Sequence, residues 1–509
     1  MLEYILSSFG TVFQPLNLLI ILLGTIIGII IGALPGLSGT MGVAVLIPLT
    51  YGMDHVTGLV MLAAVYCGST YGGSISAILV NTPGTPNAAA TGFDGHPMAL
   101  KGHAGEALIE AAVASHWGGQ ISAIALLLIA PPLAAFSLKF GPQENFMLGV
   151  FGLTIIASMS GKDMLKGIIA GLIGLFLGCI GMDPQYGYVR FTFKQMSLMT
   201  GLPTVPTLVG LFSVSQILTM VASKGGTVNT DEALKKVTKY KLSLKDLYQR
   251  WKIYVPCGIM GTFIGMVPAA GGSIAAFLGY DTAKKISKHP ETFGEGNRDG
   301  VAGPESANNG VTGGCMIPMM TLGIPGNAVS AILMGALMLH GLTPGNDLFT
   351  AKAGITYPFI ISLFVANIVM LFCGLFGAKQ FAKVNRVPQH YLVAVITVLV
   401  VIGSMAVNNS WTDIYIMLIV GVLGYVLRRF GFDMSPVVLG FILGPIAEKG
   451  WLRTLIINGH DMKAAVSSYF TRPICLVLLA VSLLSLLYPV YMNRKAKKKA
   501  EAAAAAQNA

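Results

Sequence analysis

Residues 306–346 read SANNGVTGGCMIPMMTLGIPGNAVSAILMGALMLHGLTPGN, and no aspartate, glutamate, lysine or arginine occurs among them. Because about 20 apolar residues in a helix cross a bilayer core, this stretch is long enough to span a membrane. Uncharged stretches of similar character cover residues 4–53, 353–378 and 473–493. Charged residues make up 11% of the 509 residues, against about 25% in soluble proteins. The sequence therefore predicts an all-α polytopic membrane protein with about a dozen membrane segments.

The basic residues are concentrated in loops rather than on one soluble face. Residues 223–252 contain eight lysines and arginines, and residues 493–501 contain five. By the positive-inside rule both segments belong in the cytoplasm, and the N-terminus is expected in the periplasm. A charge distribution of this kind does not predict nucleic-acid binding. The six scattered cysteines predict no disulfide framework, metal site or cofactor, and no phosphate-binding loop of an ATPase is present.

The chain resembles itself at matching places in the same order. The paired segments are 28–35 with 261–268, 72–84 with 314–326, 97–102 with 336–341, Pro142 with Pro388, and 206–210 with 436–440. The predicted organisation is a first membrane repeat (1–222), a basic cytoplasmic linker (223–252), a second membrane repeat (253–458), a closing span (459–493) and a basic, alanine-rich cytoplasmic tail (494–509).

Loop charges predict the relative orientation of the two repeats. Loop 379–387 is basic, whereas its counterpart 139–144 carries one lysine and one glutamate. At the next loop the bias is exchanged, because 161–166 contains two lysines and 407–413 contains a single charged residue, an aspartate. Basic charge therefore marks opposite loops in the two repeats, as an inverted repeat requires.

Proline and glycine lie beside small polar residues in four apolar segments, 34–40, 81–87, 268–273 and 323–327. Proline lacks a backbone donor and glycine permits sharp turns, so helices are expected to break there and to form re-entrant hairpins. Broken backbone at membrane depth needs a protein or water-filled environment. The freed N–H groups suit a carboxylate, and the freed carbonyls suit Na⁺. The alternative is that each segment is an ordinary kink or surface turn.

A second polar cluster, PESANN, occupies residues 304–309. Amide side chains both donate and accept hydrogen bonds, so Asn308 and Asn309 are candidate ligands, whereas Glu305 is expected at a polar helix start. With the broken segments, the substrate-binding candidates are Ser38, Gly39, Thr40, Thr82, Pro83, Gly84, Thr85, Asn87, Gly271, Gly272, Ser273, Asn308, Asn309, Pro325, Gly326 and Asn327. Na⁺ is expected near Asn81, Gly84, Asn308, Gly323 and Gly326.

Glu106 and Glu110 share one helical face and lie between two histidines, His103 and His116. The spacing of the histidines does not fit a helical metal motif, so we interpret this tract as a solvated helix end rather than as a metal site or a proton relay.

Segments 32–48, 71–105 and 303–325 resemble the TctA family, the large membrane subunits of tripartite tricarboxylate transporters. The resemblance extends over nearly the whole chain and includes PESANN and GIPGN in the expected order. It implies two partner proteins, a periplasmic TctC-like binding protein and a small four-span TctB-like subunit. It also implies cation-coupled uptake of a small carboxylate such as citrate across a bacterial inner membrane.

The leading hypothesis is thus a secondary transporter subunit, not an enzyme, coupled to Na⁺ in preference to H⁺. The alternatives are a membrane-embedded enzyme acting on lipid or peptide, and a passive anion channel. The enzyme would need a nucleophile with a base, or a metal cluster, within the spans, and the sequence shows neither.

Overall fold

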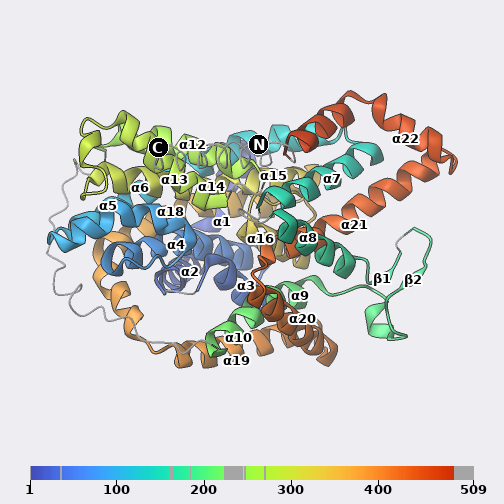
Figure 1. Ribbon diagram of the computed structural model, residues 1–509, viewed down its shortest axis with the longest axis horizontal. Helices are drawn as coiled ribbons and strands as arrows, with labels where there is room; N and C mark the ends of the chain where they lie inside the picture. Colours follow the sequence, from blue (N-terminus) through green and yellow to red (C-terminus); the bar gives the residue numbers. More distant parts are fainter. Residues whose placement is uncertain are drawn as a thin grey trace, which may run out of the picture. The chain divides into compact units, whose positions relative to one another are not determined.

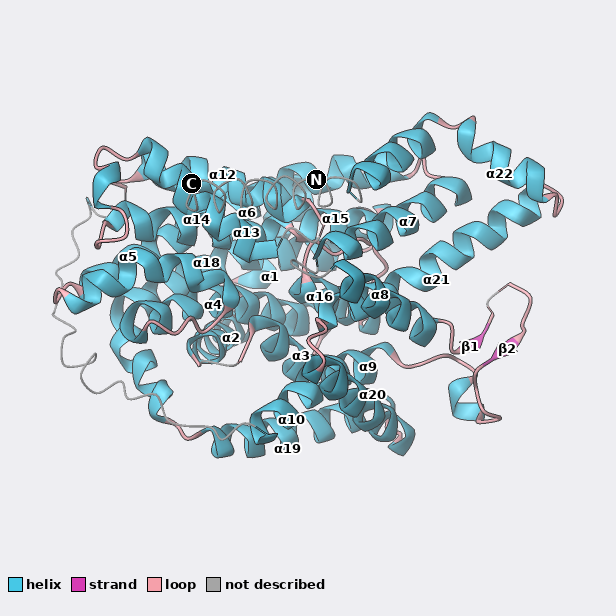
Figure 2. Ribbon diagram, in the orientation of Figure 1, coloured by secondary structure: helices cyan, strands magenta, loops and turns pink. Residues whose placement is uncertain are grey.

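The computed structural model describes residues 2–34, 37–159, 164–183, 185–222, 245, 248–268 and 271–485 (Figure 1). Almost all regular structure in this part of the chain is helical (Figure 2). The described residues contain one short antiparallel pair of strands, β1 (Gly181–Met182) and β2 (Val189–Arg190), with Gly181 opposite Arg190. Most of the predicted linker and the whole predicted tail lie outside the described residues.

The chain divides into two compact units, residues 1–137 with 203–426 and residues 138–202 with 427–509. Each unit therefore combines segments from both predicted repeats. The boundaries of the repeats themselves remain a prediction.

The first unit contains the elements that build the candidate site. Its helices are α1 (Leu2–Val12), α2 (Pro15–Ala33), α3 (Gly39–Thr50), α4 (His55–Val80), η1 (Pro86–Ala88), α5 (Ala89–Leu100), α6 (Ala104–Ser137), α9 (Thr204–Val209), η3 (Gly210–Val214), α10 (Ser215–Ala222), α12 (Trp251–Met266), α13 (Gly271–Ile286), η5 (Pro290–Thr292), α14 (Arg298–Gly314), α15 (Met316–Leu322), α16 (Ala328–Leu339), α17 (Asn346–Phe349), α18 (Ala353–Ala382), η6 (Lys383–Arg386), α19 (Gln389–Asn408) and α20 (Trp411–Arg429), the last of which runs on to the edge of the second unit.

The second unit contains α7 (Pro142–Met159), α8 (Met164–Gly178), η2 (Met196–Leu198), α21 (Met434–Ile457), α22 (Met462–Phe470) and a further helix at Pro473–Ser485, besides the two strands. Here α21 packs against α7 and α8. Two ion pairs, Arg472 with Glu144 and Arg190 with Glu448, connect its segments.

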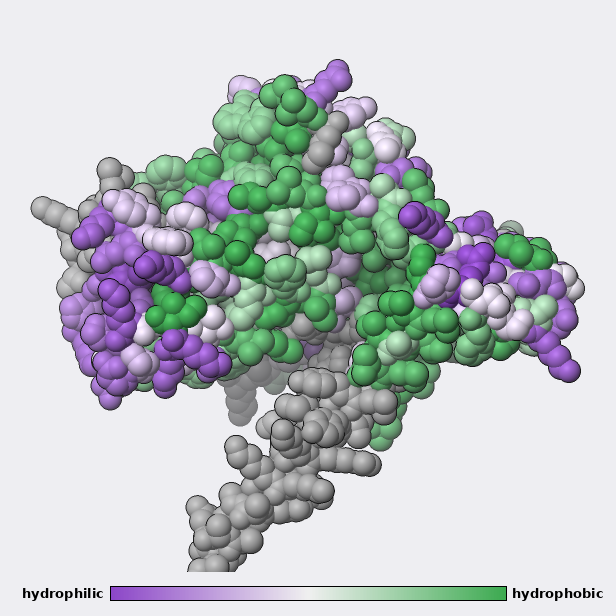
Figure 3. All heavy atoms as spheres, turned by 90° about the horizontal axis from the view of Figure 1, so that it is seen from above, coloured by the Kyte–Doolittle hydropathy of each residue, from purple (hydrophilic) through white to green (hydrophobic). Residues whose placement is uncertain are grey.

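Within the described ranges, six helices are long and apolar enough to cross a membrane: α2, α4, α6, the continuous stretch Thr204–Ala222, α18 and α20. The pair formed by α22 and Pro473–Ser485, bent by 82°, brings the number to seven if it forms one span. Hydrophobic side chains cover a broad area of the visible face, as expected for a surface in contact with lipid (Figure 3). The structure thus confirms a helical multi-pass membrane protein, whereas a dozen segments remains a prediction.

Glycines allow the central helices of the first unit to approach closely. Gly28 and Gly32 of α2 lie against backbone carbonyls of α4, and a side chain at either position would overlap with them. In the second half of the sequence Gly261 of α12 lies in the same way against the Ala307 carbonyl of α14. Small residues at such contacts permit dispersion attraction between whole helix backbones. The pairs α2 with α4 and α12 with α14 therefore use the same packing device.

Two further glycines at matching positions of the sequence repeat, Gly210 and Gly440, also lie against backbone carbonyls. Gly210 lies against the Met417 carbonyl of α20 in the first unit. In the second unit Gly440 of α21 lies against the Gly171 carbonyl of α8. Gly210 and Gly440 also correspond in the sequence repeat, so this correspondence extends to their contacts.

Candidate functional site

The helices break at all four segments that contain proline and glycine. At 34–40, α2 ends at Ala33 and α3 begins at Gly39, and at 268–273, α12 ends at Met266 and α13 begins at Gly271. Helix α4 ends at Val80, Asn81 has a positive φ of 52°, and the chain stays irregular until η1 and α5 begin. Helix α15 ends at Leu322, Gly323 has a φ of 70°, and α16 begins at Ala328. The predicted breaks at 81–87 and 323–327 are therefore present as the turns of two helical hairpins, which we call hairpin 1 (α4–α5) and hairpin 2 (α15–α16).

One glycine in each turn makes the same type of contact. Gly84 in the turn of hairpin 1 lies against the carbonyl oxygen of Gly32 on α2. Gly326 in the turn of hairpin 2 lies against the carbonyl oxygen of Gly265 on α12, which a Cβ atom would approach to 2.5 Å. Neither position has room for a side chain, so the turn backbone is fixed directly on the end of a neighbouring helix.

The turn of hairpin 1 meets the second half of the chain at the start of α13. Ser273 Oγ donates a hydrogen bond of 2.9 Å to Asn87 Oδ1. Gly272 lies directly under the Asn87 amide, and a Cβ atom there would be 2.8 Å from Asn308 Oδ1. Four predicted ligands from three separate elements, Asn87, Gly272, Ser273 and Asn308, therefore converge. We call them the amide cluster.

Asn308 stands out in the amide cluster because it is 1% exposed and, within the part of the chain that the structure describes, neither its Oδ1 nor its Nδ2 has a hydrogen-bond partner. Thr85 Oγ1, in the adjacent turn, and Asn309 Oδ1 are likewise buried and unpaired. Buried polar atoms are nearly always hydrogen-bonded in native proteins. The Asn308 amide can both donate and accept hydrogen bonds, and it lies beside the first turn of α13, where the helix has N–H groups without a partner inside the helix. This arrangement is suited to binding an anion together with a cation.

The polar residue in the turn of hairpin 2, Asn327, has protein hydrogen-bond partners. Asn327 caps α16, because its Oδ1 accepts from the Ser330 N–H at 2.8 Å, and its Nδ2 donates to Tyr66 Oη at 2.9 Å. Tyr66 of α4 corresponds to Asn308 of α14 in the sequence repeat, and its hydroxyl also contacts Cys315 at 3.4 Å. The Asn327 amide is thus occupied by protein partners, and Tyr66 is a residue that the sequence interpretation missed.

The other predicted residues lie apart from the amide cluster or at its edge. Ser38 caps α3 by accepting from the Met41 N–H, and Gly39 lies against the Ser69 hydroxyl. Asn81 and Thr82 are exposed at the tip of hairpin 1. The remaining candidates have these positions: Thr40 and Pro83 are half-buried, Pro325 is buried, and Gly271 begins α13 with a φ of 68°.

Asp94 fastens hairpin 1 to the second half of the chain. Its Oδ1 accepts hydrogen bonds from the backbone N–H groups of Gly294, Gly296 and Asn297 at 2.7–2.9 Å, and its Oδ2 accepts from Tyr280 Oη at 2.8 Å. The carboxylate is fully buried, so these donors replace its hydration.

Asp94→Asn should therefore destabilise the protein by about 1–3 kcal/mol, since the amide keeps the shape but loses the charge that strengthens the four hydrogen bonds. Asp281→Asn is the matched control, because Asp281 is exposed and pairs only with Lys285. Thermal unfolding in detergent measures both variants. Equal melting temperatures for the two would contradict the fastening role of Asp94.

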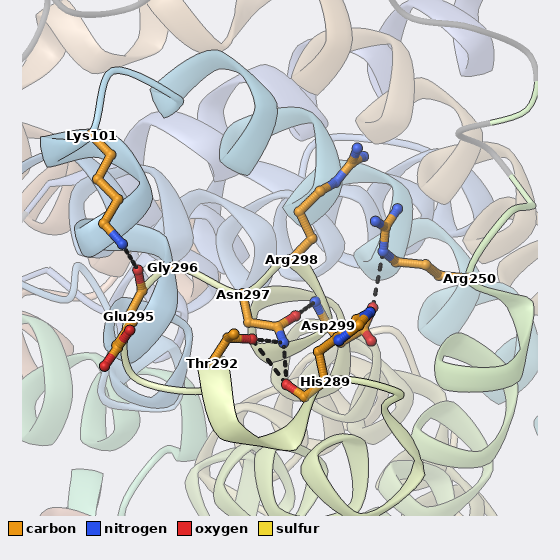
Figure 4. Close-up of a pocket in the computed structure, with 9 residues that line it drawn as sticks. All are labelled: Lys101, Arg250, His289, Thr292, Glu295, Gly296, Asn297, Arg298 and Asp299. Atoms are coloured by element: carbon orange, nitrogen blue, oxygen red, sulfur yellow. Dashed lines mark hydrogen bonds and ion pairs between the residues drawn. The ribbon is translucent and has the colours of Figure 1, made fainter.

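A polar pocket of about 420 Å³ lies beside this contact and is drawn in Figure 4. Arg250 reaches Asp299 and Lys101 reaches the Glu295 carbonyl in this view. Arg298 pairs with Glu110 at 2.6 Å and with Glu106 at 2.7 Å. Because both arginines of the pocket already have acidic partners and Lys101 donates to a backbone carbonyl, we assign the candidate site to the amide cluster rather than to this pocket.

The ion pairs around Glu110 correct the interpretation of residues 103–116 as a solvated helix end. Glu110 is buried, because Arg250 and Arg298 from the second half of the chain lie against it and Tyr254 Oη donates to it at 2.6 Å. The described residues contain no group of three histidine, cysteine or acidic side chains that could hold a metal ion.

A comparison with known protein families identifies the family of the chain. The family model of the tripartite tricarboxylate transporter TctA family matches residues 18–439. The chain belongs to the TctA family. As a TctA family member it is a large membrane subunit of a tricarboxylate transporter.

Two curated proteins of Agrobacterium vitis are similar to this TctA family chain. An uncharacterized 52.8 kDa protein in the TAR-I ttuC' 3'region is 36% identical over 491 residues, which cover 96% of each chain. An uncharacterized protein in the TAR-II ttuC' 3'region is 35% identical over 238 residues, 47% of this chain and 97% of that protein. No solved structure matches the chain.

Proposed function

We propose that this chain is the permease subunit that carries a small carboxylate across a bacterial inner membrane with a coupled cation, Na⁺ in preference to H⁺. A TctC-like periplasmic protein delivers the substrate, and a TctB-like four-span subunit completes the transporter. These partners and the coupling follow from membership of the TctA family and from the chemistry of the amide cluster.

The observation that carries the proposal is the unpaired, buried amide of Asn308. Its Nδ2 can donate to a carboxylate, which the free N–H groups at the start of α13 also attract. Its Oδ1 and the carbonyls freed in the turn of hairpin 1 can accept a cation. In a low-dielectric site each charge offsets part of the desolvation cost of the other, so that the two ions bind together.

Uptake into proteoliposomes tests this function directly. The chain, reconstituted with its two partner proteins, should accumulate labelled citrate or another small carboxylate only when an inward Na⁺ gradient is imposed. A passive channel would equilibrate the carboxylate without accumulating it, and a membrane-embedded enzyme would convert a lipid or peptide without uptake. Either result would reject the proposal.

We further propose that the two halves are inverted repeats. The matched contacts of Gly84 with Gly32 and of Gly326 with Gly265 support a repeat, as do those of Gly210 and Gly440. The exchanged loop charges support the inversion.

Single cysteines introduced at positions 163 and 411 of a cysteine-free chain should therefore react with an impermeant thiol reagent from opposite sides of the membrane. Position 163 lies in the basic loop of the first half, outside the described residues, and position 411 begins α20. Labelling in intact spheroplasts and in inverted vesicles distinguishes the two sides. Reaction of both positions from one side would rule out the inversion.

A further inference from the structure

Glu305 on α14 is a fully buried carboxylate with neutral partners. Thr91 Oγ1 of α5 contacts its Oε1 at 2.6 Å, and Ser115 Oγ of α6 contacts its Oε2 at 2.8 Å. Within the described part of the chain no lysine, arginine or histidine forms an ion pair with it. The three residues come from three helices, and both contacts have the length of ordinary O–H···O hydrogen bonds.

The negative charges of two other buried carboxylates, Glu110 and Asp94, are balanced by arginines or by several hydrogen-bond donors. Glu110 pairs with Arg250 and Arg298 and accepts from Tyr254. Asp94 accepts four hydrogen bonds, three of them from backbone N–H groups. Both environments suit a charged carboxylate, whereas the environment of Glu305 does not.

Burial of a negative charge with only two neutral hydroxyl partners is strongly unfavourable, and such a group neutralises by taking up a proton. A protonated carboxyl fits the same contacts, because a hydroxyl can accept a hydrogen bond as readily as it donates one. The neutral acid then donates to one hydroxyl and accepts from the other. The geometry therefore favours the protonated form of Glu305 while α5, α6 and α14 remain in contact.

The geometry points to Glu305 as a proton-binding site of the transporter, which holds its proton while Thr91 and Ser115 contact it and releases it to solvent water when α5 moves away. In the release step the O–H bond of the carboxyl breaks, a water molecule takes the proton, and the carboxylate keeps the electron pair. This inference rests on the proposed transport function and adds that hairpin 1 moves during the cycle, a movement that must also break the hydrogen bonds of Asp94.

The position of Glu305 connects the proton to the substrate site. Glu305 lies three residues before Asn308, about one helical turn away on α14. Thr91 lies on hairpin 1, whose turn carries Asn87 of the amide cluster. A movement of hairpin 1 would therefore open the amide cluster and expose the carboxyl together.

The titratable and charged groups on the helices around α14 have their own environments. They are His55, Tyr66, Cys67 and Tyr71 on α4, Asp94 and His96 on α5, Glu106, Glu110 and His116 on α6, Lys252, Tyr254 and Cys257 on α12, and Tyr280, Asp281, Lys284 and Lys285 on α13. His116 contacts the Asn367 carbonyl and His96 contacts the Ile78 carbonyl. Tyr71 Oη is buried without a partner among the described residues, and its hydroxyl is neutral in the physiological range.

Infrared spectroscopy of the purified full chain tests the protonation independently of transport. The wild type should show a carbonyl band of a buried carboxylic acid near neutral pH, and Glu305→Gln should lack it. Glu106→Gln is the matched control, because Glu106 is half-buried and pairs with Arg298, and it should leave the band unchanged. If Glu305→Gln fails to fold, Thr91→Val provides the same test, since loss of one hydrogen bond should shift the band to higher frequency. A wild type without this acid band would overturn the proposal.

Uptake by the reconstituted transporter at equal internal and external pH tests the role of the proton in the cycle. Burial raises the pKa of the Glu305 carboxyl to about 7. Wild-type uptake should therefore fall severalfold between about pH 6 and about pH 8, because the carboxyl must be reprotonated in each cycle, whereas Glu305→Gln should change less than about twofold. A variant with the wild-type pH profile would overturn the coupling. If no carboxylate is taken up at all, the proposed function fails, and the infrared result still decides whether Glu305 holds a proton.

Discussion

Replacing Asn308 by leucine should reduce uptake by about 100-fold or more and leave the protein folded. Leucine has nearly the shape of asparagine but can neither donate nor accept a hydrogen bond. Since Asn308 Oδ1 and Nδ2 have no hydrogen-bond partner among the described residues, the substitution removes no hydrogen bond seen in that part of the chain. Thermal stability should stay the same or rise slightly, because two unsatisfied buried polar atoms disappear.

Asn17 provides the opposite control. It is also buried, but its Oδ1 accepts from Thr57 Oγ1 at 2.9 Å and its Nδ2 donates to the Thr11 carbonyl at 2.8 Å. Asn17→Leu should therefore lower stability by about 1–3 kcal/mol and leave the apparent substrate affinity unchanged. Uptake kinetics and thermal unfolding of both variants check the comparison. Normal uptake by Asn308→Leu would remove Asn308 from the transport site.

The second large effect is expected at the hairpin turns. Gly84→Ala and Gly326→Ala each place a Cβ atom against a backbone carbonyl, of Gly32 and of Gly265 respectively, where neither backbone can yield without moving a helix end. We expect a destabilisation of about 1–3 kcal/mol and a displaced turn. Because the turn of hairpin 1 is part of the proposed site for both ligands, the apparent affinities for the carboxylate and for the coupling cation should weaken together in Gly84→Ala. Gly326→Ala should show the same joint effect if the turn of hairpin 2 also serves this site.

Gly92→Ala is the matched control for these two variants. Gly92 lies on α5 of hairpin 1, the hairpin that also contains Gly84, and its backbone is helical. A Cβ atom at Gly92 would be 3.6 Å from its nearest neighbour, which is an ordinary contact. Alanine should be tolerated there and favour the helix by up to about 1 kcal/mol. Uptake at varied substrate and Na⁺ concentrations measures all three variants. If only one of the two apparent affinities changed in Gly84→Ala or Gly326→Ala, the shared site would be wrong.

Several features could be predicted from the sequence because they depend on local chemistry. The uncharged stretches predict membrane helices, since charge is costly in lipid wherever a helix lies. Proline and glycine at 81–87 and 323–327 predict helix breaks, since they act on the backbone of their own segment. The repeat of the glycines at 32 and 265 predicts equivalent positions, and in the structure the carbonyls of both lie against a glycine in a hairpin turn.

The partners of the polar side chains could not be predicted in this way. Glu305 and Asn308 lie on one helix and looked equally polar in the sequence, but the first meets two hydroxyls from other helices and the second meets none. Asn327 resembled a ligand, yet its amide caps α16 and reaches Tyr66. The spacing of residues along one segment does not show which side chains from a distant segment will contact a given polar residue.

The sequence by itself thus determined the class of protein, the family, and the places where the helices break, because these depend on composition, motif order and the conformations open to proline and glycine. Only the tertiary structure decided which of the polar residues have partners: it covers Glu110 with two arginines, satisfies Asp94 with backbone N–H groups, and leaves the amide of Asn308 unpaired. The physical reason is that the cost of burying a polar group depends on the donors and acceptors within about 3 Å of it. In this fold some of those donors and acceptors come from segments 200 or more residues away in the sequence, as for Asp94, Glu305 and Asn327.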